Sequence, residues 1–148
     1  GGNMFKKILI PVDGSEPSQK AMEMAVNLQK SFDCELYILT VFRHHSLLEA
    51  SLSMVRSEEP EVMDDILRKH ASGVAESAKK AAQELGAEKV RAFVKNGPPA
   101  RTIVSFAKDK DVDLIVLGSR GHGDVEGFLL GSVSHKVTSL AKCPVMVV

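Results

Sequence analysis

The sequence lacks an excess of charge of either sign, and it lacks any long apolar run. Lys and Arg number 19 together, as do Asp and Glu, so the formal net charge is zero. No long block of basic residues is present, and nucleic acid is therefore not expected as the main partner. The longest apolar runs have only the length of a strand, so no membrane span is predicted.

Cysteine is also scarce. The two cysteines, Cys34 and Cys143, show neither C-x-x-C spacing nor clustered ligands. We therefore expect two reduced thiols that pack as small core residues, and neither a disulfide nor a metal site is predicted from them.

The chain has 148 residues, of which 44% are hydrophobic. This is enough for one substantial core and too little to predict two, so we expect one domain over residues 4–148. The N-terminus has no charged segment followed by an apolar one, so no secretory signal is predicted and a cytoplasmic location is expected. Residues 1–3, which precede Met4, are expected to be an expression scar outside the fold.

The sequence predicts five strands, of which the first two are buried, because strands covered on both faces have continuous apolar sequences. They cover residues 6–12, 35–41, 89–94, 113–118 and 144–148. Segments with helical spacing separate them: a helix capped by Ser15, a long helix over residues 61–85 closed by Gly86, a helix starting near Ala100, and a last helix before residue 144. This alternation predicts an open parallel α/β sheet with helices on both faces.

The helical spacing also predicts which side chains point inward. The long helix is expected to bury Val62, Ile66, Leu67, Val74, Ala78, Ala81, Ala82 and Leu85. The last helix is expected to bury Val133, Val137, Leu140 and Ala141.

The pattern weakens between residues 42 and 60. A lid or partner surface and a solvated insertion both fit this excursion, and the solvated insertion is favoured. His44 and His45 lie here, but adjacent side chains point apart on a strand or helix and no third ligand is nearby, so no metal site is predicted.

The most specific stretch starts at Gly118, directly after the fourth predicted strand. Glycines let the backbone approach a ligand closely, and Ser132 and Ser134 add hydroxyls at a helix start, which is typical of a phosphate-binding loop. A Walker A loop is excluded, because Gly131 is followed by Ser132 and the stretch contains no lysine.

A Rossmann fingerprint is also disfavoured for this stretch. Gly121, Gly123 and Gly127 have the spacing G-x-G-x-x-x-G, late in the chain. The glycines alone would also fit a tight loop without a ligand.

In open α/β sheets a ligand binds beyond the carboxyl ends of the strands, where the strand order reverses. After the first predicted strand, Asp13 can accept hydrogen bonds from ribose hydroxyls. After the second, Val41 offers a backbone edge to a purine ring, which leaves the glycine stretch for phosphates. Asp13 before Gly14 also fits a plain turn or helix-capping residue.

Gly118, Gly121, Gly131 and Ser132 have the spacing G-x2-G-x9-G-[ST], which resembles the ATP-binding signature of the universal stress protein family. The resemblance covers nearly the whole chain. It implies a Rossmann-like fold, similar to adenine nucleotide alpha hydrolases, with an open five-stranded parallel sheet of order 3-2-1-4-5 and helices on both faces. It implies ATP as the ligand, on whose phosphates we expect Mg or Mn, and a homodimer through residues 144–148.

The resemblance further implies roles for individual residues. Pro11, Val12 and Asp13 would flank adenine and ribose, and the Val41 backbone would meet adenine. Ribose and phosphates would be held by Gly118, Gly121, Gly131, Ser132, Val133 and Ser134. The same loop includes Ser119, Arg120, His122 and Gly123, of which Arg120 and His122 either reach the phosphates or stay solvated. No protein metal ligand and no catalytic residue is predicted.

Three functions are compatible with these features. They are a nucleotide-responsive regulator in stress response with slow or no ATP hydrolysis, a weak ATPase or adenylyl-transferring enzyme, and a nucleotide-free interaction scaffold. The intact glycine signature disfavours the scaffold, and the lack of a loop lysine and of an acid–base pair disfavours the enzyme. The regulator is therefore the prediction.

Overall fold

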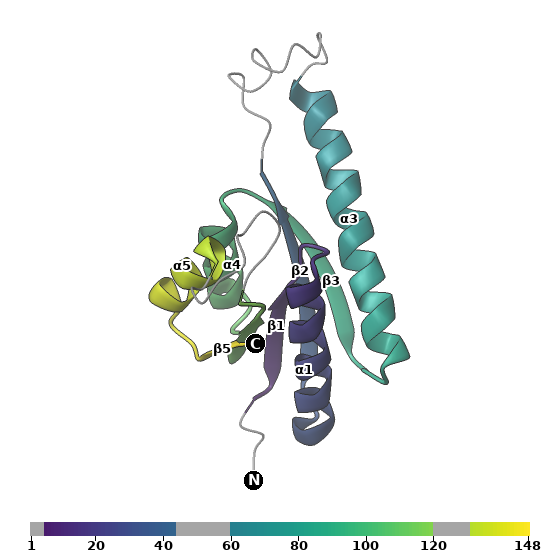
Figure 1. Ribbon diagram of the computed structural model, residues 1–148, viewed down its shortest axis with the longest axis vertical. Helices are drawn as coiled ribbons and strands as arrows, with labels where there is room; N and C mark the ends of the chain where they lie inside the picture. Colours follow the sequence, from purple (N-terminus) through teal and green to yellow (C-terminus); the bar gives the residue numbers. More distant parts are fainter. Residues whose placement is uncertain (1–4, 44–59, 120–130) are drawn as a thin grey trace.

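The computed structural model describes residues 5–43, 60–119 and 131–148. Five parallel strands form one sheet of order β3-β2-β1-β4-β5. Their bounds are β1 (Lys7–Pro11), β2 (Glu35–Phe42), β3 (Val90–Asn96), β4 (Leu114–Leu117) and β5 (Val145–Val147). The predicted fold class and strand order are confirmed, and Figure 1 shows the sheet between its helices.

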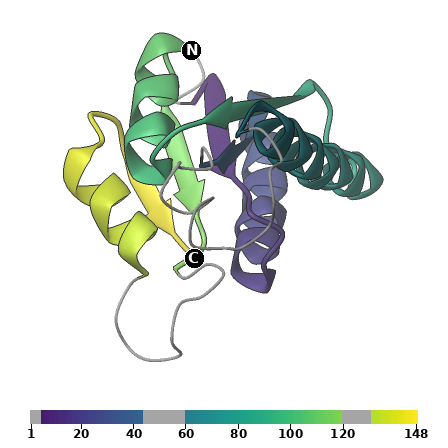
Figure 2. The same ribbon diagram turned by 90° about the horizontal axis from the view of Figure 1, so that it is seen from above.

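Helices cover both faces of the sheet. The helices α1 (Glu16–Phe32) and α3 (Pro60–Glu84) lie on one side, while α4 (Pro99–Asp109) and α5 (Ser132–Leu140) lie on the other, as Figure 2 shows. Because β1 is followed by α1 on one face and β4 by α5 on the other, the winding direction reverses between these two strands.

The core has two layers that share the sheet. Ile8 and Ile10 of β1 point toward α1 and α3, whereas Leu9 between them points toward α4 and α5. All three are fully buried. Burial on both faces explains why β1 is a continuous apolar run rather than an alternating one.

The termini of α1 follow from its sequence. Ser15 is the N-cap, and its hydroxyl accepts the Ser18 N–H at 3.4 Å. Asp33 in the left-handed conformation closes the helix and donates its N–H to the Gln29 carbonyl at 2.7 Å. Gly86, predicted to close the long helix, has a positive φ of 100° just past α3.

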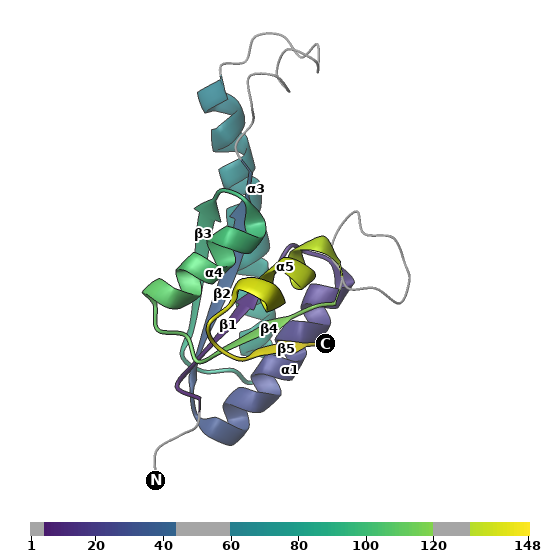
Figure 3. The same cartoon turned by 90° about the vertical axis from the view of Figure 1, so that its left-hand side faces the viewer.

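The predicted inward face of α3 was wrong at both ends. Ile66 is 52% exposed and Leu85 44% exposed, whereas the buried residues include Ala71 and Ala75, which the prediction omitted. Figure 3 shows that α3 extends well beyond the other helices, so its first turns have no sheet beneath them. Small side chains mark the stretch that packs against β2 and β3.

The last helix also differs from the prediction. Leu140 is 46% exposed, whereas Ala141, which lies past the end of α5 as its C-cap, packs half-buried against the core, as does Val133. Val137 is fully buried, as predicted. Most of the excursion predicted between residues 42 and 60, with His44 and His45, lies outside the described residues. Within the described ranges, every helix is too short or too polar to cross a bilayer.

Candidate ligand site at the carboxyl ends of the strands

A cavity of about 310 Å³ lies where β1, β2 and β4 end and α5 begins. This is the point at which the winding of the sheet reverses, the usual ligand position in such folds. The structure brings eight of the predicted site residues together in its wall: Pro11, Val12, Asp13, Val41, Gly118, Ser132, Val133 and Ser134.

Of the remaining six predicted residues, only Ser119 and Gly131 are described, and neither lines this cavity. Arg120, Gly121, His122 and Gly123 lie outside the described residues. Ser119 and Gly131 connect the ends of the glycine loop, since the Gly131 N–H donates to the Ser119 carbonyl at 2.7 Å. The Ser119 N–H in turn donates to the Val148 carbonyl at 3.0 Å, which anchors the loop to the end of the chain.

Asp13 lies in the turn between β1 and α1. Its Oδ1 accepts the Ser15 N–H at 2.9 Å, and Gly14 has a φ of 85°, a conformation that favours glycine. The turn role considered for Asp13 is therefore present. A carboxylate can accept at both of its oxygens, so this role is compatible with hydrogen bonds to a ligand.

Val41 directs its backbone toward the cavity. The last pair between β1 and β2 joins Pro11 and Leu39, and the Val12 N–H donates to the Leu39 carbonyl at 2.9 Å. In a parallel pair alternate residues direct both backbone groups to the same neighbour. Val41 therefore directs its N–H and C=O toward the space beyond the end of β1.

Gly118 and Ser134 have structural roles in the cavity wall. A Cβ at Gly118 would lie 2.6 Å from the carbonyl carbon of Pro17, so the glycine allows β4 to end against the first turn of α1. The Ser134 hydroxyl donates to the Gly118 carbonyl at 2.6 Å and ties α5 to β4. Both residues are thus explained in part without a ligand.

The start of α5 faces the cavity through Ser132, Val133 and Ser134. The helix has nine residues, and its N-cap is Gly131, which has no side chain to cap the first N–H groups. Unpaired N–H groups and the positive end of the helix dipole favour an anion at this position.

Several residues of the cavity wall were not predicted from the sequence. Arg43 directly follows β2, and Pro99 opens α4 after β3; both line the cavity. The other four are Ser18, Leu39, Ile103 and Leu117. Pro99 could have been found by looking past the carboxyl end of the third predicted strand as well. Leu39, Leu117 and Ile103 look like ordinary core residues in the sequence, so no pattern marks them as part of a site.

Neither cysteine supplies a reactive group to this site. Both are free, with Cys34 buried and Cys143 half-buried, and burial raises the pKa of both thiols above their ordinary value. Among the described residues, no three His, Cys, Asp or Glu side chains gather closely enough to hold a metal ion.

A doubly wound parallel sheet with a cavity at its switch point and an uncapped helix start defines a class of α/β ligand-binding proteins. The universal stress protein family model matches residues 4–148, and the chain belongs to this family. Universal stress protein YxiE of Bacillus subtilis is 40% identical over 148 residues, covering 98% of this chain and 99% of its own.

Solved structures agree with this assignment. Universal stress protein MJ0577 of Methanocaldococcus jannaschii superposes with a TM-score of 0.82 at 30% identity, over 98% of this chain and 96% of its own. Two further universal stress proteins, one in complex with cAMP and one from Archaeoglobus fulgidus in complex with dAMP, have TM-scores of 0.70 and 0.66. Their identities of 23% and 21% establish the shared fold.

Proposed function

We propose that this protein binds ATP in the cavity at the strand ends and acts as a nucleotide-responsive regulator in stress response, with slow or no hydrolysis. The observation that carries the proposal is the convergence of the Val41 backbone, the Asp13 carboxylate and the start of α5 on one cavity. The Val41 backbone can pair with the edge of a purine, Asp13 can accept from ribose hydroxyls, and the start of α5 can hold phosphates. Base, sugar and phosphates follow one another in this order in a nucleotide.

The adenine lies against Pro11 and Val12, next to the backbone of Val41. The Val41 carbonyl accepts from the adenine amino group and its N–H donates to the ring nitrogen beside it. Guanine has an oxo group where adenine has the amino group, so the carbonyl would repel it. This arrangement supports an adenine nucleotide in particular.

The phosphates lie at the start of α5, where Ser132 and Val133 offer backbone N–H groups and Ser132 a hydroxyl. A triphosphate that meets only amides and hydroxyls keeps uncompensated negative charge. Mg²⁺ or Mn²⁺ therefore accompanies the phosphates, held by their oxygens and water rather than by protein side chains. Arg43 adds one positive charge to the cavity wall.

A titration of ATP with Mg²⁺ by calorimetry tests the site. The variant Asp13→Asn keeps an oxygen for the Ser15 N–H but loses the charge. We expect it to retain native circular dichroism and to bind ATP about tenfold more weakly, since a hydrogen bond to a charged group contributes about 1.5–3 kcal/mol.

GTP serves as the ligand control and should bind more weakly than ATP. The proposal fails if wild-type protein binds neither nucleotide, or if Asp13→Asn and wild type bind ATP equally. A GTP affinity equal to that of ATP would remove Val41 as the purine contact.

The regulator and the enzyme differ in turnover. Among the described residues of the cavity wall, Asp13 is the one carboxylate and Arg43 the one cation, whereas fast phosphoryl transfer needs an oriented nucleophile and several positioned charges. Phosphate release should therefore stay below about 1 per second. Faster sustained release that is lost in Arg120→Ala or His122→Ala would identify an enzyme and its catalytic group.

A further inference from the structure

A second cavity, of about 550 Å³, lies between α1 and α3 on the face opposite α4 and α5. Its apolar wall includes Met22 of α1 and Val74, Ala78 and Ala81 of α3. Gly14 and Ser15 of the β1–α1 turn line it as well, as do Lys69 and His70 from the N-terminal half of α3. The size is within the range typical of pockets for small organic ligands.

The polar groups of this cavity are unevenly distributed. Its described wall contains no Asp or Glu, whereas Lys69 supplies a positive charge and His70 a hydrogen-bond donor. Lys69 pairs with Asp65 at 3.3 Å, but both side chains are exposed, and an exposed pair of this kind contributes little. Lys69 can therefore exchange this partner for an anionic ligand at low cost.

Gly73 leaves room for an occupant along the wall of α3. It lies in the middle of a 25-residue helix, where glycine costs about 0.5–1 kcal/mol relative to alanine. A Cβ built there meets nothing within 4 Å, so no packing contact of the described chain requires a glycine. Gly73 is exposed and lines the cavity, so open space adjoins the cavity wall at this position.

We propose that this cavity binds a small organic anion with an apolar body, of the class of medium-chain carboxylates. The chain of the ligand packs between Met22 and Val74, and its carboxylate meets Lys69 and His70. The proposal does not rest on nucleotide binding. Val12 and Ser18 line both cavities, however, so the two ligands would share the β1–α1 turn as a common wall.

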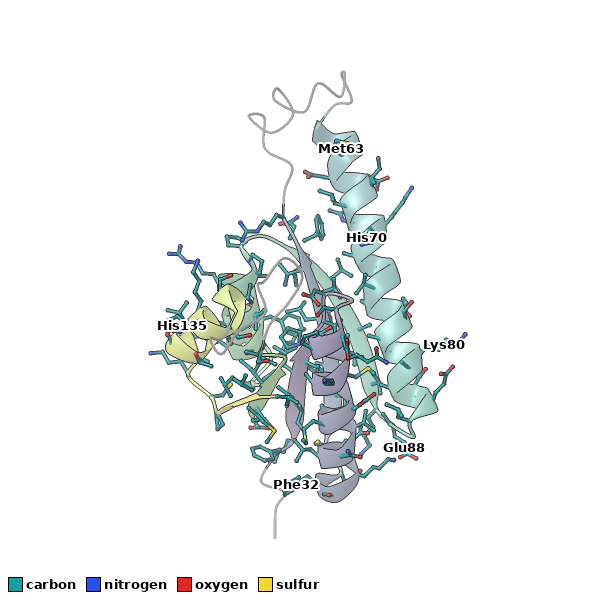
Figure 4. All side chains as sticks on the ribbon, in the orientation of Figure 1. Phe32, Met63, His70, Lys80, Glu88 and His135 are labelled. Atoms are coloured by element: carbon teal, nitrogen blue, oxygen red, sulfur yellow. The ribbon has the colours of Figure 1, made fainter. Side chains whose placement is uncertain are left out.

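Decanoate, titrated by calorimetry into the nucleotide-free protein, is the probe, and decyltrimethylammonium is the control with the same chain and opposite charge. Figure 4 shows His70 on the upper part of α3 and Lys80 pointing away from the sheet, so Lys80→Met is the matched control for Lys69→Met. Gly73→Leu places a large side chain at the cavity wall, and leucine also favours the helix.

We expect one decanoate per chain and weaker binding of the cation. Gly73→Leu should weaken decanoate binding by at least about tenfold, Lys69→Met by about threefold, and Lys80→Met should leave it unchanged. The Met22 methyl resonance, assigned with Met22→Leu, should shift on addition of decanoate.

The inference is overturned if decanoate does not bind, if the cation binds equally well, or if Gly73→Leu retains native circular dichroism and wild-type affinity for decanoate. Gly73→Leu should keep the ATP affinity of the wild type, because Gly73 does not line the cavity at the strand ends. The failure of this site and the failure of the nucleotide site are thereby distinguishable.

Discussion

At Gly118 and Gly73, the surroundings of the residue decide whether adding a Cβ stabilises or destabilises the fold. A Cβ at Gly118 would meet the backbone of Pro17 at 2.6 Å, and backbone cannot yield as a flexible side chain can. We predict that Gly118→Ala lowers the free energy of unfolding by about 1–3 kcal/mol, as overpacking does. Gly73→Ala should raise it by about 0.5–1 kcal/mol, because the helix gains and nothing clashes.

Urea unfolding of the two variants measures both effects in one experiment. Equal effects of the two substitutions would mean that the close approach of Gly118 to Pro17 is not a constraint on the fold.

Thr40 presents a buried hydroxyl group that none of the described residues satisfies. Its side chain is 5% exposed, and its hydroxyl has no hydrogen-bond partner among the described residues. We predict that Thr40→Val raises the free energy of unfolding by about 1 kcal/mol, since an unpaired buried hydroxyl costs that much or more.

Thr102→Val is the control, because the Thr102 hydroxyl donates to the Pro98 carbonyl at 2.7 Å. That substitution should lower stability by about 1 kcal/mol, as the loss of a typical hydrogen bond does. If thermal unfolding shows Thr40→Val to be as destabilising as Thr102→Val, the Thr40 hydroxyl has a partner after all.

At the residue scale, the sequence could predict positions more readily than roles. Asp13 and Val41 could be placed at the site because a parallel sheet brings the carboxyl ends of its strands to one edge. The packing of Gly118 on Pro17 could not, since it depends on how α1 docks beside β4. Arg43 was missed because one charged residue after a strand looks like any solvated side chain.

At the scale of elements, a single side chain joins α1 to the turn that leads into β3. The Gln29 amide nitrogen donates to the carbonyls of Cys34, at 2.8 Å, and of Glu88, and its oxygen accepts the Glu88 N–H at 3.0 Å. We predict that Gln29→Met lowers the free energy of unfolding by about 2–3 kcal/mol, because buried backbone groups lose their partners.

Gln83→Met provides the exposed comparison on α3 and should change stability by less than about 0.5 kcal/mol. Hydrogen exchange should also show faster exchange of the Glu88 N–H in Gln29→Met. Unchanged stability in this variant would mean that water replaces the amide without loss.

Elements were also predictable to different degrees. All five strands were predicted to within one or two residues. For β1, β2 and β4 the reason is burial on both faces, which produces a continuous apolar run. The face of α3 was harder, since large apolar residues such as Ile66 suggest burial although the helix projects past the sheet there. Alanine occurs on buried and exposed helix faces alike, so the sequence did not indicate that Ala71 and Ala75 are buried.

At the scale of the whole molecule, the two edges of the sheet differ in chemistry. The edge strand β3 carries the exposed Arg91 and Lys95, and charged side chains on an edge disfavour pairing with another sheet. The other edge, β5, has the sequence VMV, all half-buried and without a charge. An apolar edge of this kind is stable in solution when something covers it, and a second copy of the chain can do so by two-fold antiparallel pairing.

The backbone of β5 shows how to test this pairing without damage to the sheet. The Val148 N–H donates to Leu117, and the Pro144 carbonyl accepts from Ile115, so the even-numbered residues face β4. Alternate residues face opposite neighbours, and the Val147 N–H therefore points to the open edge. Proline at that position removes only an outward donor, which edge strands tolerate.

We predict that the wild type sediments as a dimer and that Val147→Pro sediments as a monomer with native circular dichroism. Met146→Pro is the matched control: it removes an N–H that points toward β4, so it should destabilise the subunit itself. A wild type that stays monomeric at high concentration would contradict the pairing. A folded Val147→Pro dimer would also contradict it, since the interface would then lie elsewhere and the apolar edge of β5 would need another cover.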